Sequence, residues 1–386
     1  MKSTISTAQF NRNTMTCKRY QPSTLPILRA GLLVAVTAIA LFAAATQVHA
    51  QAIGFVWNNN PTTKGTTTPD SSYSYNSSGG AISITRNSKG NYTVDFAGLG
   101  DSFYSDVQVN GYGPGSDFCN VAGWYSPNGT DVEIGVLCYT HAGVPADHSF
   151  TLLYQARTSS DPTTPDVAFL WANQPTASSY TPSGLYQYNV FGGTNIITRN
   201  SKGNYSATLP GFTTTGGTVI VTAYGSTPAH CQVTDWGSGG SGTVVNVNCT
   251  NTAGVATDSE FDLVYSIYET AGYGADSDAG GAIWAFNDTD KSPYDVTGTY
   301  SIGIDGIDMY AQRLGTGQYA WTMTVDDTWT SSNVLATAYG APGNYCTTKE
   351  WLSSSTTTTV YINCFNSAGT PANTRFTATF QLAGIY

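Results

Sequence analysis

The chain has 386 residues, of which 40% are hydrophobic, 12% aromatic and only 10% charged. None of its 25 acidic residues and five of its 15 basic residues precede position 51, so the remainder carries a net charge of −15. The aromatic content argues against a disordered chain, and the acidic balance argues against nucleic acid or anionic lipid as a partner.

The first residues, 1–50, have the pattern of a secretory signal peptide. Basic residues up to Arg29 precede an apolar run over 30–45, and Val48 and Ala50 are small residues at −3 and −1 of a cleavage point. The apolar run is shorter than the ~20 residues that span a bilayer, so we expect no transmembrane segment in the mature chain. The predicted location is secreted, extracellular or at the cell surface, with the periplasm as the alternative.

The rest of the chain is a repeat in three copies. Residues 84–92 recur unchanged at 197–205, and 311–319 is a diverged third copy. A period slightly above a hundred residues suits one domain per copy. The predicted domains are repeat 1 at 51–157, repeat 2 with its linker at 158–271, and repeat 3 with its linker at 272–386. The linkers themselves are placed at 158–166 and 269–280.

Each repeat shows the same order of strands, illustrated by repeat 1. A first strand carrying Trp57 is followed by a loop rich in Pro, Ser and Thr, and a second strand runs through Tyr75 to an Arg-bearing turn. A third strand leaves this turn, a fourth ends in Tyr-Gly, a Cys hairpin supplies two more, and the seventh begins at Phe150. Period-two alternation dominates, which predicts an all-β chain of three tandem antiparallel β-sandwich domains (immunoglobulin-like or related), with about seven strands each.

The Cys hairpin is the most regular feature of the repeat. In each copy a Trp follows the first Cys by five residues, and counting outward from Asn128–Gly129 places Cys119 opposite Cys138. The repeat and the predicted export favour three disulfides. The alternative, zinc, lacks any CxxC spacing and any His that recurs beside these Cys. The predicted pairs are Cys119–Cys138, Cys231–Cys249 and Cys346–Cys364.

The tips of the three hairpins are predicted to differ. Asn128–Gly129 predicts a tight type I′ turn in repeat 1. The Gly-rich 237–242 and the Ser/Thr-rich 353–359 predict longer loops in repeats 2 and 3.

The pattern resembles a repeated Cys…Trp…Cys all-β module of secreted bacterial proteins. The resemblance implies export and modular organisation and brings no activity with it. In the third copy Asn373 replaces the aspartate of Asp147 and Asp258, which argues against a ligand role for that position. The residues that carry the resemblance are Tyr180-Thr-Pro, Gly192-Gly193, Gly203-Asn-Tyr205, Thr222-Ala-Tyr-Gly225, Cys231…Trp236…Cys249, Ala253-Gly254 and Asp258…Phe261…Tyr265.

The hairpin tryptophans Trp124, Trp236 and Trp351 are the first candidate binding residues. The apolar residues of the returning strand share a face with the Cys, whereas each Trp lies an odd number of residues from its Cys. A regular strand would therefore turn the Trp outward, where it could stack on a sugar ring. The alternatives are a β-bulge that returns the Trp to the core, or packing against a neighbouring repeat.

The Arg-bearing turns are the second candidate. Arg86 with Lys89, and Arg199 with Lys202, form basic tips on an acidic protein and could contact an acidic glycan. The alternative is that these residues keep an edge hairpin soluble.

Catalytic and metal signatures are weak. No His recurs between repeats, and Gly100-Asp101-Ser102 resembles the start of a GDS-type esterase motif without the α/β fold or the distant Asp-x-x-His of that family. The acidic stretch 287–290 lacks the Gly and distal Glu of a calcium loop.

We therefore predict a non-enzymatic protein without cofactor or metal. The predicted function is a secreted or cell-surface modular binding or adhesion protein, with polysaccharide or cell-surface glycan as the expected partner. A self-associating structural or matrix protein and a secreted hydrolase are the alternatives.

Overall fold

The computed structural model describes residues 51–100, 104–157, 166–267, 280–298, 300–303, 308–324 and 331–383. These residues belong to one compact unit, Val48–Tyr386. The predicted signal peptide and all but the last residue of each predicted linker lie outside the described residues. Within them, no helix has the length and apolar character needed to cross a membrane.

The regular secondary structure of the described chain is almost entirely β-strand, as predicted. Two 3-10 turns, η1 (Ser71–Tyr73) and η2 (Gly184–Tyr186), are its only helical segments. Repeat 1 contains β1 (Gln51–Asn58), β2 (Gly65–Thr67), β3 (Ser74–Asn76), β4 (Ile82–Ser88), β5 (Asn91–Phe96), β6 (Tyr104–Tyr112), β7 (Phe118–Tyr125), β8 (Val132–Tyr139) and β9 (Ser149–Arg157). Repeat 2 contains β10 (Asp166–Ala172), β11 (Ser179–Tyr180), β12 (Gln187–Asn189), β13 (Ile196–Ser201), β14 (Asn204–Pro210), β15 (Thr218–Tyr224), β16 (Ala229–Gly239), β17 (Gly242–Asn251) and β18 (Glu260–Ile267). Repeat 3 contains β19 (Gly280–Ala285), β20 (Tyr294–Asp295), β21 (Ile302–Gly303), β22 (Met309–Gly315), β23 (Gln318–Met323), β24 (Ser332–Tyr339), β25 (Tyr345–Ser353), β26 (Thr358–Phe365) and β27 (Arg375–Leu382).

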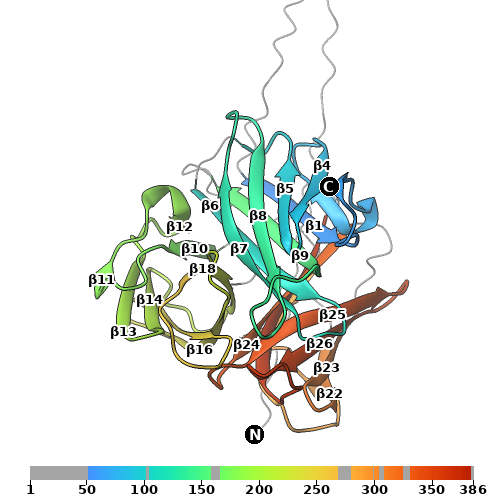
Figure 1. Ribbon diagram of the computed structural model, residues 1–386. Helices are drawn as coiled ribbons and strands as arrows, with labels where there is room; N and C mark the ends of the chain where they lie inside the picture. Colours follow the sequence, from blue (N-terminus) through green and yellow to red (C-terminus); the bar gives the residue numbers. More distant parts are fainter. Residues whose placement is uncertain are drawn as a thin grey trace, which may run out of the picture. The chain divides into compact units, whose positions relative to one another are not determined.

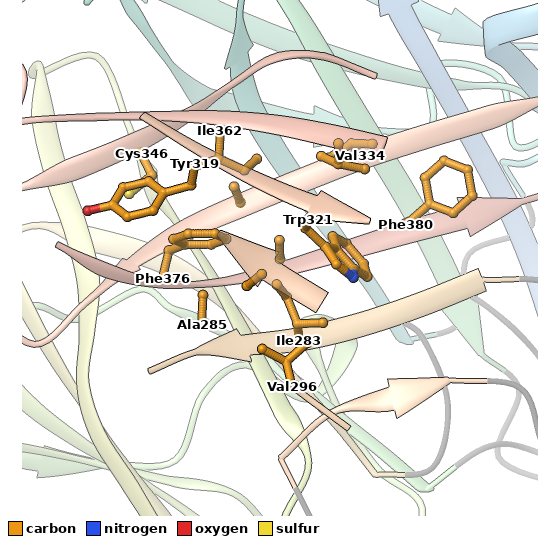
Figure 2. Packing of buried hydrophobic residues seen from close by; sticks show 14 of the residues in the cluster. Ile283, Ala285, Val296, Tyr319, Trp321, Val334, Cys346, Ile362, Phe376 and Phe380 are labelled. Carbon is orange, nitrogen blue, oxygen red and sulfur yellow. The ribbon is translucent and has the colours of Figure 1, made fainter. Parts of the chain in front are cut away.

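Each repeat forms a β-sandwich of two half-sheets whose strand pairs are antiparallel. In repeat 1 the inner half-sheet has the order β3-β1-β9-β6 and the outer half-sheet the order β2-β4-β5-β8-β7. Apolar side chains from both half-sheets fill the space between them. In repeat 3 this core includes Trp321, Phe376 and Ile283, which point toward one another from β23, β27 and β19 (Figure 2).

The predicted second strand is divided between the two half-sheets. β3 pairs with β1 in the inner half-sheet, whereas β4 pairs with β5 in the outer one. Gly79 and Gly80 lie between them, and Gly79 has a φ of 71°, which only glycine adopts without strain. This division, together with the short strand β2, raises the number of strands in repeat 1 from the predicted seven to nine.

The three repeats are joined in a closed cycle. β7 of repeat 1 bridges β15 of repeat 2, β16 of repeat 2 bridges β24 of repeat 3, and β25 of repeat 3 bridges β6 of repeat 1. All three bridges are parallel and join an outer to an inner half-sheet, so each nine-stranded sheet contains strands of two repeats (Figure 1). Each repeat therefore contacts both of the others, although the repeats follow one another in the sequence.

The inner half-sheets are buried on both faces. One face packs in the sandwich of its own repeat, and the other meets the inner half-sheets of the neighbouring repeats. This central contact contains Phe55 and Leu153 of repeat 1, Phe169 and Ile220 of repeat 2, and Leu335 of repeat 3. Polar side chains of the same face are buried with them, which the alternating sequence pattern does not reveal.

The three predicted disulfides are present and join the predicted pairs. The hairpin tips of repeats 1 and 2, however, reverse the prediction, whereas repeat 3 has the predicted longer loop, with four residues between the paired Ser353 and Thr358. In repeat 2 Gly239 pairs with Gly242, which leaves a turn of two residues. In repeat 1 the strands end at Tyr125 and begin again at Val132, because Asn128 Oδ1 accepts the main-chain N–H groups of Thr130 and Asp131 and organises a wider loop.

Candidate functional site

The hairpin tryptophans face the core because each hairpin contains a β-bulge. The register shifts between Val121 and Gly123, between Val233 and Asp235, and between Thr348 and Glu350. One extra residue before each Trp reverses the alternation that the sequence predicts. Trp124, Trp236 and Trp351 are only 8%, 7% and 6% exposed, so the outward orientation predicted for a regular strand is wrong.

Each hairpin tryptophan also packs against a neighbouring repeat. Trp124 of repeat 1 meets three rings of repeat 2, with centroid distances of 5.3 to 6.1 Å and edge-to-face geometry. Such edge-to-face contacts add to the free energy gained by burying the rings. The three clusters are Trp124 with Trp171, Tyr186 and Tyr224; Trp236 with Trp284, Tyr300 and Tyr339; and Trp351 with Trp57, Tyr73 and Tyr112.

The indole N–H groups at the centre of these clusters are used inside the protein. Trp124 Nε1 donates to Ser105 Oγ and Trp351 Nε1 to Ser332 Oγ, both at 2.9 Å, and Trp236 Nε1 donates to the Gly216 carbonyl at 3.3 Å. With their faces and N–H groups occupied, these rings join the repeats and leave no surface on which a sugar could stack.

The Arg-bearing turns form an internal latch. In repeat 1 Arg86 donates through Nε and Nη2 to the two oxygens of Asp147, at 2.9 and 2.8 Å. The Asp147 carboxylate also accepts the Gly90 main-chain N–H at 2.9 Å and the Tyr92 hydroxyl at 3.2 Å. This latch ties the turn between β4 and β5 to the segment that leads into β9.

The same latch recurs in the other repeats. Arg199 donates two hydrogen bonds to Asp258, both at 2.9 Å, and this interaction lowers the pKa of Asp258 to about 2. In repeat 3 Asn373 Oδ1 accepts from Arg313 Nε and the Gly317 N–H, both at 3.0 Å. Arg86 and Arg199 are therefore committed to internal partners, whereas Lys89 and Lys202 are exposed at the turns.

The outward faces of the outer half-sheets are the surfaces that could contact a large ligand. In repeat 1 this face carries Thr66 and Thr85, whose hydroxyls lie 2.8 Å apart on β2 and β4. In repeat 2 it carries Ser206 and Asn246, which share a 2.7 Å hydrogen bond. Hydroxyl and amide groups in cross-strand rows thus face outward in these two repeats.

The corresponding face of repeat 3 is more apolar. Tyr310 is 43%, Leu314 47% and Leu352 58% exposed, where repeat 1 has Ser83, Asn87 and Tyr125. Lys349 Nζ lies 5.3 Å from the centre of the Tyr361 ring. We define the repeat 3 face as Tyr310, Gln312, Leu314, Thr322, Leu352, Thr359 and Tyr361.

A small cavity of about 50 Å³ lies where the three repeats meet. Its lining includes His230, which stacks on Tyr345 with a centroid distance of 4.0 Å and lies 4.1 Å from Phe118. Burial lowers the pKa of His230 to about 3, so its imidazole is neutral and unsuited to acid–base chemistry near neutral pH. The volume suits one or a few water molecules rather than an organic ligand.

A larger hollow of about 330 Å³ is lined by Tyr104 of repeat 1 and by residues 184–194 of repeat 2. Its two buried or half-buried amides are already paired: Gln187 bonds Pro182 O and the Asn195 N–H, and Asn189 bonds Pro210 O and the Phe191 N–H. These side chains stabilise the loop and have little capacity left for a ligand.

The other candidates from the sequence are the acidic stretch 287–290 and the GDS-like triplet at 100–102, and neither is shown as part of a catalytic or metal site. Asn287 Oδ1 accepts from Thr289 and Asp290 within its own turn, which accounts for this stretch as a capped loop. Asp101 and Ser102 of the GDS-like triplet lie outside the described residues. In the part of the chain that the structure describes, no group of three His, Cys, Asp or Glu residues is placed to hold a metal ion.

The chain matches no protein-family model, no curated protein and no solved structure. A functional proposal therefore depends on the surfaces described above.

Proposed function

We propose that this is an exported polysaccharide-binding protein of the adhesive kind, and that the repeat 3 face is its contact surface. The observation that carries the proposal is the combination on this face of an exposed ring, Tyr310, and a half-buried ring, Tyr361, with hydroxyl and amide groups. A sugar ring has apolar C–H faces and a rim of hydroxyls, so it is matched by flat aromatic side chains beside neutral hydrogen-bonding groups.

The geometry of the face supports this proposal. Tyr310 on β22 pairs across the sheet with Thr322, and Thr322 pairs with Thr359 on β26. Tyr361 lies two residues further along the same strand as Thr359, so the two tyrosines are two strand spacings apart across the sheet and two residues apart along it, about 12 Å in all. A chain of sugar units could therefore cover both rings and the threonines between them.

The mature charge and the predicted export are compatible with such a ligand. A net charge of −15 disfavours polyanions, so the proposed ligand is a neutral polysaccharide. The proposed ligand is therefore narrower than the glycans predicted from the sequence, and the basic turn tips are not part of the proposed contact surface.

Binding to insoluble neutral polysaccharides, measured by depletion of the full chain from solution, tests the proposal. Replacing Tyr310 and Tyr361 together by Ala should weaken binding about tenfold or more, because each stacked ring contributes on the order of 1 kcal/mol. Tyr125→Ala, at a 58% exposed tyrosine of repeat 1, is the matched control and should bind normally. Equal binding by all three proteins would exclude the repeat 3 face, and no binding to any neutral polysaccharide would exclude the function.

Self-association through the same face is the second candidate, because Leu314 and Leu352 expose apolar area there. Edge-to-edge association is disfavoured, since the six strands at the sheet edges contain only two or three residues each. Sedimentation separates the two candidates: a monomer at micromolar concentration supports the binding protein, and an oligomer disrupted by Leu352→Ser supports the structural one.

A further inference from the structure

The three inner half-sheets are joined by hydrogen bonds at equivalent positions. Thr151 Oγ1 of repeat 1 donates to the Val334 carbonyl of repeat 3 at 2.6 Å. Thr377 Oγ1 of repeat 3 donates to the Val219 carbonyl of repeat 2 at 2.5 Å. We call these contacts joints, because each ties the last strand of one repeat to the fourth predicted strand of another.

The third joint has an acid in place of the threonine. Asp262 pairs with Thr222 across the sheet as Thr151 pairs with Asn110 and Thr377 with Thr337, so it occupies the same position in repeat 2. The carbonyl equivalent to those of Val219 and Val334 belongs to Val107 of repeat 1. Asp262 is fully buried, and neither carboxyl oxygen has a hydrogen-bond partner among the described residues.

A carboxylate is an unsuitable group for this position. The two equivalent side chains are hydrogen-bond donors that face a carbonyl oxygen, whereas an ionised carboxylate can only accept. Two acceptors facing each other in a buried place would repel, and both would remain unsatisfied.

We propose that Asp262 is protonated in the folded protein and donates its hydroxyl proton to the Val107 carbonyl, so that a bound proton completes the third joint between the repeats. The proposal is independent of any ligand on the repeat 3 face.

The charged and titratable surroundings agree with a neutral Asp262. Asp106 on β6 is also buried and accepts hydrogen bonds from Gln108 Nε2 and Gln155 Nε2, at distances between 3.2 and 3.4 Å. Burial raises the pKa of Asp106 to about 7 and raises the pKa of Asp262 well above its ordinary value. Negative charge on Asp106 or on Glu260 raises the pKa of Asp262 further.

Two other titratable side chains, Tyr224 and Arg157, belong to the surroundings of Asp262. Tyr224 on β15 lies near Asp262, and burial keeps its hydroxyl protonated at neutral pH. Arg157 on β9 is the buried cation of this region and follows Gln155 by two residues on the same strand face. Burial is the largest cause of the raised pKa of both aspartates.

A proton held only in the folded state makes closure of the three repeats depend on pH. An aspartate with a raised folded pKa stabilises the fold fully below its unfolded pKa of about 4, and this contribution is lost as pH rises through the folded pKa. The ratio of folded to unfolded protein should fall by up to tenfold per pH unit for each such carboxyl in this window. The contribution of Asp262 to the free energy of unfolding is thus largest in a mildly acidic medium and decreases toward alkaline pH.

Denaturant unfolding of the full chain between about pH 4.5 and 8 tests the proposal against two variants. Asp262→Thr installs the residue of the other two joints and should remove the share of the pH slope due to one proton, leaving the fold more stable than wild type at the alkaline end. Asp106→Asn is the control: it should remove the share of the slope due to Asp106 and keep a share due to Asp262, over a narrower pH range because the charge on Asp106 no longer raises the pKa of Asp262. An unchanged slope in Asp262→Thr, or greater wild-type stability at the alkaline end, would overturn the proposal.

A second measurement needs no variant and decides the case if Asp262→Thr does not fold. In the wild-type chain with ¹³C-labelled aspartate carboxyls, two resonances, those of Asp106 and Asp262, should remain at the protonated position at about pH 5.5, where exposed aspartates are ionised. A single protonated resonance would be accounted for by Asp106 and would count against the proposal. If every folded-state aspartate titrates below that pH, Asp262 carries a charge and the joint is not closed by a proton.

Discussion

The latch shows which property of the side chain at position 147, and at the equivalent positions 258 and 373, is common to the three repeats. Asp147 and Asp258 accept two hydrogen bonds from an arginine and one from a glycine N–H, whereas Asn373 keeps one arginine bond and the glycine bond. The shared requirement is an acceptor oxygen at the turn. The negative charge is an addition that repeat 3 lacks.

Glycine is required at this turn for a second reason. Gly90 has a φ of 69°, and a Cβ there would lie 2.5 Å from the Cys138 carbonyl oxygen. Gly203 and Gly317 meet Cys249 and Cys364 in the same way, at 2.5 and 2.3 Å. The glycine therefore lets the turn approach the disulfide-bearing strand, where its carbonyl accepts the cysteine N–H.

Substitutions at Asp147 should separate the acceptor from the charge. Asp147→Asn copies repeat 3 and should lower the thermal midpoint by less than about 3 °C, whereas Asp147→Ala removes the acceptor and should lower it by more. Calorimetry of the full chain measures both. Equal losses would mean that the charge, rather than the acceptor oxygen, stabilises the turn.

The latch also predicts behaviour in acid. The arginine hydrogen bonds lower the pKa of Asp147 and Asp258, so their contribution to stability is present above the unfolded pKa of about 4 and is lost as pH falls through the folded pKa. The acid limb of the stability profile should therefore become shallower in Asp147→Asn, because one of the two titrating latches is removed.

At the scale of the strand, one inserted residue decides the role of the hairpin tryptophan. The bulge before Trp236 places Thr234 opposite no residue of β17, while Val233 and Asp235 pair with Val247 and Asn246. Without the extra residue Trp236 would lie on the solvent face of the sheet. The bulge therefore allows the same ring to serve the sandwich core and the contact with repeat 3.

Deletion of Thr234 should turn Trp236 outward. We expect a loss of stability of about 3–5 kcal/mol, the usual cost of emptying a core tryptophan site, together with a red shift of tryptophan fluorescence. Thr234→Ala keeps the number of residues and is the control that should retain the native spectrum. Native fluorescence and stability in the deletion variant would show that the strand can recover the register by another route.

At the scale of the whole molecule, the cycle of bridges makes the repeats interdependent. The polar residue Asn110 of repeat 1 illustrates this, because its Nδ2 donates to the carbonyls of Ala336 and Cys346, at 2.9 and 3.0 Å, and its Oδ1 accepts the Thr348 N–H at 2.8 Å. Thr222 and Thr337 hold the equivalent places and donate to the carbonyls of Val109 and Val221. Opening one repeat would leave such groups unsatisfied in both others.

The full chain with intact disulfides should therefore unfold in one cooperative transition. Differential scanning calorimetry should give a single peak whose calorimetric and van't Hoff enthalpies agree. The physical reason is that the inner half-sheets are buried on both faces and cannot remain folded alone. Separate transitions for the three repeats would instead describe independent domains on linkers.

The sequence by itself determined the local architecture. Period-two alternation located the strands, and self-similarity divided them into three repeats. The positions of Cys119 and Cys138 predicted the disulfide, because directly opposed residues of a hairpin lie close enough to be joined. These properties depend on neighbours in one hairpin or on comparison between copies, and both can be read from the chain.

Only the tertiary structure decided what covers each face. Asp106, Gln108 and Asn110 alternate with apolar residues as a solvent-facing row would, yet they are 1%, 0% and 7% exposed because the other repeats lie against them. Alternation separates two faces of a strand and carries no information about a distant segment that packs on the polar one. The inward position of Trp124 and the burial of Asp262 have the same cause, because a neighbouring repeat packs against each of them. Trp124 meets Trp171 and Tyr224 of repeat 2, and Asp262 interacts electrostatically with Asp106 of repeat 1.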